Sequence, residues 1–341
     1  MTALRRPSSR GHVVHMHIEN VSTYHKHVQV EAEHYAEAAA RHPALARRVR
    51  ATIGWDFRSF DAEMRDAEIL VFMGLDFKPG NFRKRAPKLR WIQLTSAGID
   101  HVSPLDWLPR GVVMTNNSGV HAEKHGEFGL TALLMLNHNV PIMTTNQRRA
   151  RWHTVFGSPI RGKTVAIVGV GRIGGRAAEL CKAMGMTVLG VRRGGGAHPH
   201  VDEMFRPAQV RKAMARADFV LVTLPLTGAT RHFVGRRELE AMKPGAGFAN
   251  LGRGATVDYD ALRALLESGR LSGAVLDAFE EEPLPASSPL WRTRNLIVSP
   301  HCSSSDVDRY VPDTLDLTFD NLGRYMRGQP LRNAVDLRLG Y

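Results

Sequence analysis

The chain has 341 residues, 43% of them hydrophobic, and a formal net charge of +13 at pH 7. This length predicts two domains, and no apolar run approaches the ~20 residues that cross a bilayer, which excludes a membrane-spanning protein. The basic segment Met1–Arg10 has no apolar stretch behind it, so we expect no signal peptide. The two cysteines, Cys181 and Cys302, lie far apart, which argues against a disulfide framework and predicts a cytoplasmic location, where thiols stay reduced.

The positive charge predicts an anionic small-molecule ligand, and neither nucleic acid nor a membrane is expected as a partner. Basic residues are scattered in short groups such as Arg83-Lys84-Arg85 and Arg148-Arg149. The sequence has no basic patch interleaved with aromatic residues and no known nucleic-acid-binding module. A positive field would instead help to collect anionic substrate and cofactor.

The first 117 residues alternate between strand and helix patterns, which predicts a small α/β domain. Helical composition extends from about His25 to Arg50, and the loop signal Asn116-Asn117-Ser118-Gly119 marks the end of the domain. The predicted strands are Val13–Ile18, Ile69–Phe72, Leu89–Leu94 and Val112–Thr115.

A long helix is predicted from about Ala122 to Asn139, ended by Pro141. Its middle is mostly apolar, so we expect it to be buried or to lie in a subunit interface. His121 and His125 stand four residues apart at its start, a spacing that can chelate a metal. No third ligand is evident, so we predict no metal site.

The stretch from Thr164 to Val191 has the strand, glycine loop, helix and strand order of a dinucleotide-binding unit. In a G-x-G-x-x-G loop the first glycine allows a tight turn, the second lets the backbone approach a pyrophosphate, and the third lets helix and strand pack closely. The helix N-terminus offers N–H groups and a positive dipole end to the phosphates. The parts are the strand Val165–Val168, the glycines Gly169, Gly171 and Gly174, the helix Arg172–Met184, which Gly185 would end, and the strand Thr187–Val191.

The strand and helix patterns continue to alternate after this loop, which predicts a doubly wound parallel sheet. A last helix, from about Asp308 to Arg327, would return the chain to the first domain. We therefore expect a substrate domain of residues 1–117 and 302–341, and a dinucleotide-binding domain of residues 118–301. The remaining predicted strands are Phe219–Val222, Ala246–Leu251, Gly273–Asp277 and Leu296–Val298, with helices at Glu238–Met242 and Tyr259–Glu267.

Three polar residues, Arg253, Glu282 and His301, follow predicted strands at or just after their carboxyl ends, where open parallel sheets bind ligands. Hydride transfer to a 2-oxo acid needs an acid that protonates the developing alkoxide, and histidine suits this role near neutral pH. A carboxylate beside the imidazole favours its charged form and fixes its tautomer. An arginine can bind the substrate carboxylate and polarise the carbonyl group. We therefore group the three residues, although each taken singly could be an ordinary surface or loop residue.

The residues after the strand Thr187–Val191 favour NADP(H) over NAD(H). A site that prefers NAD usually has Asp or Glu about 20 residues beyond the glycine loop, bonded to the ribose 2′-hydroxyl. Here Arg192 and Arg193 occupy that position, and no acidic residue follows before Asp202. Guanidinium groups bind a 2′-phosphate, which a carboxylate would repel. If the arginines merely face solvent, NAD(H) is the cofactor instead.

From Trp91 to about Ser305 the chain resembles the D-isomer-specific 2-hydroxyacid dehydrogenase family, and within it the NADPH-dependent glyoxylate/hydroxypyruvate reductases. The resemblance implies two Rossmann-like domains, with the central doubly wound domain inserted in a smaller flavodoxin-like substrate domain. It also implies reversible reduction of a 2-oxo acid by NAD(P)H, and a homodimer formed through the long helix near residues 121–140. The stretches that carry it are Leu94–Asp100, Gly169–Gly174, Leu224–Thr227, Asn250–Gly254 with Val257-Asp258, Leu276–Pro285 and Ser299–His301.

The resemblance also implies roles for individual residues. Backbone amides at Ala97 and Gly98, beside Ser96, would hold the substrate carboxylate. His301 would be the acid/base, Glu282 its partner, and Arg253 the residue that binds and polarises the substrate. Cofactor contacts are implied for Gly169, Gly171, Arg172, Ile173, Gly174, Arg192, Arg193, Leu224, Pro225, Thr230 and Asp277.

Two alternatives stay open at this point. The same chemistry would serve another 2-oxo acid, such as 3-phosphohydroxypyruvate or phenylpyruvate. The family also includes dinucleotide-sensing corepressors, which bind the cofactor as a signal. The segment Cys302–Ser305 is more polar than in many members of the family, which predicts a different polarity of the substrate pocket.

Overall fold

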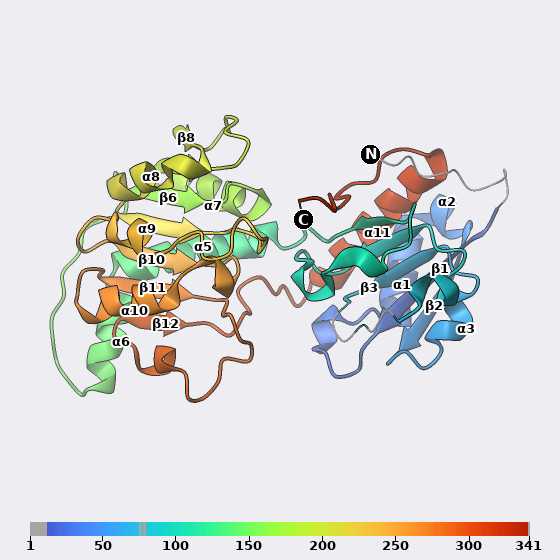
Figure 1. Ribbon diagram of the computed structural model, residues 1–341, viewed down its shortest axis with the longest axis horizontal. Coiled ribbons are helices and arrows are strands. Elements are labelled where there is room, and N and C mark those ends of the chain that lie inside the picture. The colour runs from blue at the N-terminus through green and yellow to red at the C-terminus, as the bar shows by residue number, and fades with distance from the viewer. Residues whose placement is uncertain (1–11, 75–76, 78–79, 340–341) are drawn as a thin grey trace. The chain divides into compact units, whose positions relative to one another are not determined.

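The computed structural model describes residues 12–74, 77 and 80–339, so the basic segment Met1–Arg10 lies outside the described residues. The chain divides into two compact units (Figure 1). The first unit combines the residues up to His121 with those from Asp306 onward, and the second is Ala122–Ser305. No helix among the described residues combines the length and the apolar character needed to cross a membrane.

The first unit contains a parallel sheet with the strand order β2-β1-β3-β4-β5. This is the flavodoxin-like order, as predicted for the smaller domain. The C-terminal helix α11 packs beside α1, where Phe319 contacts Tyr35 (Figure 1). The strands are β1 (Val14–Asn20), β2 (Val49–Trp55), β3 (Ile69–Phe72), β4 (Trp91–Leu94) and β5 (Val113–Thr115), and the helices are α1 (Ala32–Arg41), α2 (Pro43–Ala46), α3 (Phe60–Met64), α4 (Phe82–Arg85) and α11 (Tyr310–Arg327).

The predicted helical segment from His25 to Arg50 is wrong at both ends, because α1 begins only at Ala32 and a strand begins at Val49. His42 leaves the helical region (φ −124, ψ 51), and Pro43 begins the short helix α2. The chain then enters the edge strand β2, which pairs with β1. Most residues of β2 are only partly buried, so its sequence lacks the continuous apolar run that marks an interior strand.

The second unit contains a parallel sheet with the strand order β12-β11-β10-β9-β6-β7-β8, and this confirms the predicted doubly wound fold. Two apolar clusters, one of them including Val168 and the other Ile167, cover its opposite faces. The strands are β6 (Thr164–Val168), β7 (Thr187–Val191), β8 (Glu203–Phe205), β9 (Phe219–Val222), β10 (Gly247–Asn250), β11 (Gly273–Leu276) and β12 (Leu296–Val298), and the helices are α5 (Ala122–Asn137), α6 (Val140–Arg148), α7 (Arg172–Ala183), α8 (Val210–Arg216), α9 (Arg236–Glu240) and α10 (Tyr259–Glu267).

Pro141 begins a helix where the sequence predicted that it ends one. Helix α5 ends at Asn137, and Asn139 has a left-handed backbone (φ 57) that turns the chain. Proline is favoured in the first turn of a helix because the N–H it lacks would have no partner there. Pro141 therefore lies in the first turn of α6, which the sequence analysis missed.

Candidate active site

The carboxyl ends of three neighbouring strands in the second unit carry the predicted polar residues. Arg253 follows β10, Glu282 follows β11 and His301 follows β12, and the three strands are adjacent in the sheet. Parallel pairing puts these carboxyl ends at one edge. Glu282 contacts His301 directly, and Glu282 also lies within the electrostatic influence of Arg253. The structure thus brings together the residues that the sequence grouped.

Glu282 and His301 form a hydrogen bond of 2.6 Å between Oε2 and Nδ1. The second carboxylate oxygen, Oε1, accepts the backbone N–H of Phe279 at 2.7 Å. Partial burial raises the pKa of Glu282, but the hydrogen bond and charge of His301, the Phe279 N–H and the charge of Arg253 outweigh burial and hold the pKa below its ordinary value. An ionised Glu282 makes Nδ1 of His301 a donor, so Nε2 is the nitrogen that can exchange a proton with a ligand.

The segment that carries His301 is anchored on the buried carboxylate of Asp277, which is 1% exposed. Ser299 Oγ donates to Asp277 Oδ1 at 2.6 Å, and the backbone amides of Cys302 and Ser303 donate to the same oxygen, each at 3.2 Å. The Ser303 hydroxyl donates to Oδ2. These bonds surround His301, whose backbone is left-handed (φ 50). The sequence analysis predicted Asp277 as a cofactor contact and missed the two serines that bind it, Ser299 and Ser303. The feature that could have identified them is that they lie two residues before and two residues after His301.

Arg253 is held by hydrogen bonds to its own backbone and by close packing of the next residue. Its carbonyl oxygen accepts from Thr256 Oγ1 at 2.6 Å and from Asn250 Nδ2 at 3.2 Å. At Gly254 a Cβ would lie 2.1 Å from the backbone carbon of Phe279, so only glycine fits. This close approach fixes the loop after β10 against the loop that leads to Glu282.

The glycine loop after β6 has the shape that a dinucleotide pyrophosphate requires. Gly169 has φ 110, and a Cβ on Gly174 would lie 2.3 Å from the Gly169 carbonyl oxygen. Gly171 precedes α7, and a Cβ added to it would meet nothing within 4 Å, so there is open space beside the helix N-terminus. Arg172 is exposed and Ile173 half-buried in the first turn of α7. The residues present therefore fit a phosphate-bearing cofactor.

Two further predicted cofactor segments flank this loop in the sheet. Leu224, Pro225 and Thr230 lie in the loop after β9, where Thr230 Oγ1 donates to the Pro225 carbonyl at 2.6 Å and fixes the loop. Arg192 and Arg193 follow β7 directly, and both are exposed. The carboxylate of Asp202 accepts from the Val188 amide at 2.7 Å and from Lys182 at 2.7 Å, near the start of β7. The acidic residue thus lies at the other end of the strand from the two arginines.

In the first unit, the predicted carboxylate-binding residues Ser96, Ala97 and Gly98 follow β4. The Ser96 hydroxyl donates to the Gly98 carbonyl at 2.9 Å, and Asn116 Nδ2 donates to the Ala97 carbonyl at 2.8 Å. These bonds fix the turn through its carbonyl groups. Among the described residues, no group of three His, Cys, Asp or Glu side chains could hold a metal ion.

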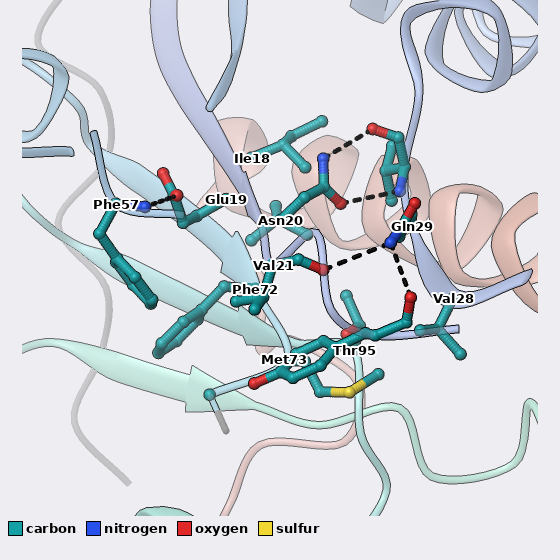
Figure 2. Close-up of a pocket in the computed structure, with 14 residues that line it drawn as sticks. Ile18, Glu19, Asn20, Val21, Val28, Gln29, Phe57, Phe72, Met73 and Thr95 are labelled. Atoms are coloured by element: carbon teal, nitrogen blue, oxygen red, sulfur yellow. Dashed lines mark hydrogen bonds between the residues drawn. The ribbon is translucent and has the colours of Figure 1, made fainter. Parts of the chain in front are cut away.

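A small pocket lies at the carboxyl ends of β1, β3 and β4 (Figure 2). It encloses about 20 Å³, which is room for about one water molecule or a group of that size. Hydrogen bonds across its wall fix its shape, because Asn20 exchanges two bonds of 2.9 Å with the Val30 backbone. The residues that line it include Glu19, Asn20, Gln29, Phe57, Phe72, Met73 and Thr95.

The chain is similar to several known proteins. Residues 130–303 match the family model of the D-isomer specific 2-hydroxyacid dehydrogenase NAD binding domain. The glyoxylate reductase of Aeropyrum pernix is 31% identical over 284 residues, covering 81% of this chain and 84% of that protein. The glyoxylate/hydroxypyruvate reductase B of Pectobacterium atrosepticum is 34% identical over 266 residues, covering 75% and 82%.

A solved structure extends the similarity to almost the whole chain. The D-isomer specific 2-hydroxyacid dehydrogenase of Xanthobacter autotrophicus Py2, crystallised with NADPH and MES, is 29% identical, with a TM-score of 0.81 and coverage of 96% of this chain and 99% of that one. The strand-end residues, the glycine loop and these similarities agree. The chain belongs to the D-isomer specific 2-hydroxyacid dehydrogenase family and is an NAD(P)-dependent oxidoreductase.

Proposed function

We propose that the protein reduces a small 2-oxo acid, of the glyoxylate or hydroxypyruvate type, to the D-2-hydroxy acid with NADPH. The observation that carries this proposal is the 2.6 Å contact between Glu282 and His301, next to Arg253 at the end of a doubly wound sheet. Names of relatives support the substrate class, since those compared here include a glyoxylate reductase and a glyoxylate/hydroxypyruvate reductase.

We assign proton transfer to His301. Bound NADPH supplies the hydride that reduces the carbonyl carbon. His301 delivers the proton from Nε2 to the carbonyl oxygen, while Glu282 stabilises the charged imidazole through Nδ1. For oxidation of the hydroxy acid the same nitrogen takes the proton back. Asp277 acts on this step indirectly, because its hydrogen bonds fix the segment that carries His301.

We assign substrate binding to Arg253 and to the turn Ser96–Gly98. The guanidinium group of Arg253 binds the 2-oxo acid and stabilises the negative charge that develops on its carbonyl oxygen. The backbone amides of Ala97 and Gly98 bind the substrate carboxylate, and the fixed carbonyl groups of that turn keep the amides in place. In this assignment the first unit is the substrate domain.

The small pocket of the first unit favours a short substrate side chain. Thr95, which lines the pocket, directly precedes the turn Ser96–Gly98. The pocket has room for about one water-sized group, which we match to a hydroxymethyl group rather than to a phenyl ring. We therefore place the substrate side chain here and favour hydroxypyruvate over phenylpyruvate. The handedness of the product tests the proposal: chiral chromatography should show D-glycerate from hydroxypyruvate, and L-glycerate would contradict the assignment.

We propose NADPH as the preferred cofactor because Arg192 and Arg193 follow β7, while Asp202 is engaged by Lys182 and Val188. The double variant Arg192→Asp/Arg193→Ala should lower the ratio of kcat/KM for NADPH to that for NADH by about 10- to 100-fold, since it removes charged hydrogen bonds to the 2′-phosphate.

Steady-state kinetics with both cofactors measure this ratio. Arg211→Ala is the matched control, because Arg211 is an exposed arginine of α8 whose side chain is 61% exposed. The control should keep the wild-type ratio. An unchanged ratio in the double variant would remove the arginines from 2′-phosphate recognition.

We also propose a homodimer. Two aromatic side chains of the segment between α6 and β6 are almost fully exposed, Trp152 at 98% and Phe156 at 88%. Large exposed aromatic groups of this kind are typical of protein–protein interfaces. The variant Trp152→Ser/Phe156→Ser should elute as a monomer at concentrations where the wild type is a dimer, as measured by size-exclusion chromatography with light scattering. The control variant Trp291→Ser, at a tryptophan that is 43% exposed, should stay dimeric. If Trp152→Ser/Phe156→Ser is still a dimer, these two residues do not form the interface.

We place the protein in the cytoplasm on the chemistry of its cysteines. Both are free thiols, with Cys181 buried and Cys302 exposed. Burial raises the pKa of Cys181 to about 12, so this thiol is inert. An exposed free thiol such as Cys302 persists in a reducing compartment.

A further inference from the structure

One face of strand β1 buries a row of polar side chains, His15, His17 and Glu19. The side chains of His17 and Glu19 are both 0% exposed. The neighbouring strand β3 puts Leu70 and Phe72 at the positions beside His17 and Glu19, and both are buried. On β3 the same face of the sheet is therefore packed with apolar residues. A buried polar pair costs free energy of folding unless it is fully hydrogen-bonded. We therefore infer that these three polar residues have a role other than packing the core.

The hydrogen bonds of this row all run in one direction. Arg50 on β2 can only donate, and its Nη2 lies 3.0 Å from His15 Nδ1 and 3.3 Å from His15 Nε2. We take the shorter contact as the hydrogen bond, which makes Nδ1 the acceptor. His15 then carries its proton on Nε2, which lies 3.0 Å from Thr52 Oγ1. The Thr52 hydroxyl donates in turn to His17 Nδ1 at 2.9 Å, and His17 Nε2 donates to Glu19 Oε2 at 2.8 Å. In this assignment each histidine carries a proton on Nε2, and both carboxylate oxygens of Glu19 accept hydrogen bonds.

The surroundings of His15 agree with a neutral ring. Burial and the charge of Arg50 lower its pKa, against the smaller opposing influences of Glu63 and Asp66. Glu63 on α3 lies 3.4 Å from His15 Nε2. We name Arg50, His15, Thr52, His17 and Glu19 the β1 relay.

The last member of the relay holds a turn with an unusual backbone. Glu19 Oε1 accepts the backbone N–H of Phe57 at 2.6 Å (Figure 2). Asp56 and Phe57 both have left-handed backbones, with φ values of 56 and 60, a conformation that favours glycine and needs support from outside the turn. Ser22 provides one anchor, donating from its amide and its hydroxyl to Asp56, and Glu19 provides the other.

A glycine makes room for this arrangement. Gly54 stands opposite Glu19 in the pairing of β1 with β2. A Cβ at Gly54 would lie 2.5 Å from Glu19 Oε2 and 2.9 Å from the His17 ring. The carboxylate and imidazole therefore occupy space that any other residue at position 54 would fill. The glycine at position 54, the strand pairing and the hydrogen bonds of the relay together hold the Glu19 carboxylate where it accepts the Phe57 N–H.

We propose that the β1 relay is a positioning device for the substrate side chain: it keeps the Glu19 side chain oriented as an acceptor in the core, and Glu19 fixes Phe57 as a rigid wall of the small pocket. This proposal rests on the proposed function, which places the substrate side chain in that pocket. Phe57 and Glu19 both line the pocket. The relay thus sets which 2-oxo acids bind well, and it takes no part in hydride or proton transfer.

The variant Glu19→Gln tests the direction of the relay without changing its shape. The carbonyl of the new side chain can still accept from Phe57, but its amide group then donates to His17 Nε2. His17 must move its proton to Nδ1, Thr52 must donate to His15, and His15 must carry a proton on Nδ1, facing Arg50. We expect KM for hydroxypyruvate to rise about tenfold, as for a slightly misplaced binding group, with kcat within about twofold. KM for glyoxylate, which has no side chain, should stay within about twofold.

A second substitution should relieve the conflict that the first creates. In Arg50→Gln/Glu19→Gln, the residue at position 50 can accept from His15 Nδ1, so the reversed relay is complete and KM for hydroxypyruvate should return most of the way to the wild-type value. Arg50→Gln alone should have little effect, because the amide group of a glutamine at position 50 can still donate to His15 Nδ1. His42→Gln is the control, since His42 forms another histidine–carboxylate contact in this unit, 3.0 Å from Asp316.

Nitrogen-15 NMR of the histidine rings gives a readout that does not depend on activity. The wild type should show neutral His15 and His17 with the proton on Nε2, and Glu19→Gln should move the His17 proton to Nδ1. Equal rises in KM for glyoxylate and hydroxypyruvate, no rise at all, or no recovery in the double variant would overturn the proposal. If the wild type reduces no 2-oxo acid, the proposed function is wrong. A His17 proton on Nδ1 in the wild type would show, independently of activity, that the assigned hydrogen-bond direction of the relay is wrong.

Discussion

Replacing His301 with asparagine should lower kcat by about 10²- to 10⁴-fold while leaving the affinity for NADPH unchanged, because the variant loses the general acid and keeps the glycine loop. Asparagine is the better choice than glutamine, since His301 has a left-handed backbone (φ 50) that asparagine tolerates. Its side chain can also still contact Glu282. Stopped-flow or steady-state rates with hydroxypyruvate measure kcat, and NADPH fluorescence titration measures the affinity.

Cys302→Ala is the matched control for this experiment. Cys302 adjoins His301, is exposed, and its thiol lies 3.6 Å from Ser299 Oγ, whereas its bond to Asp277 comes from the backbone. The control should keep the wild-type rate. Wild-type turnover in His301→Asn would remove His301 from the mechanism, and a loss of NADPH binding would mean that the substitution disturbs the fold.

Replacing Arg253 with glutamine should lower kcat/KM for the 2-oxo acid by about 10²- to 10³-fold, the usual scale for loss of a group that stabilises developing negative charge. The effect should appear in both kcat and KM, because the same guanidinium group binds the substrate and polarises its carbonyl. Arg253→Lys should recover only part of the loss, since an ammonium group keeps the charge without the paired donors.

Arg231→Gln is the control for charge alone. Arg231 is a neighbouring surface arginine of the same unit, paired with Glu280 at 2.8 Å, and its side chain is 55% exposed. It should keep kcat/KM close to the wild type. A loss in Arg253→Gln no larger than that in Arg231→Gln would show that the contribution of Arg253 is only the general positive field.

Most of the second unit could be predicted from the sequence because its signals are local, although α6, β8 and α8 were missed. Each interior strand is a short apolar run, as in Phe219–Val222, and the glycine loop fixes where strand ends and helix begins. Arg253, Glu282 and His301 could be grouped because parallel pairing brings the carboxyl ends of adjacent strands together. The contact between Glu282 and His301 follows from that topology.

Features that depend on partners distant in sequence could not be predicted. Strand β2 is a partly buried edge strand, and β1, which pairs with it, lies more than 25 residues earlier. The role of Asp277 depends on serines that the fold brings to it from beyond β12. The sequence predicted the strand Val13–Ile18, but only the structure shows that its polar face is buried, with His17 against Phe60 of α3.

Initial rates of absorbance loss at 340 nm test whether the protein is an NADPH-dependent reductase of small 2-oxo acids. NADPH and NADH are each tested against glyoxylate, hydroxypyruvate, pyruvate, phenylpyruvate and 3-phosphohydroxypyruvate. We expect oxidation of NADPH with glyoxylate or hydroxypyruvate, at a higher kcat/KM than with phenylpyruvate. NADPH binding without turnover of any of the five acids would contradict it and would favour a dinucleotide-sensing role.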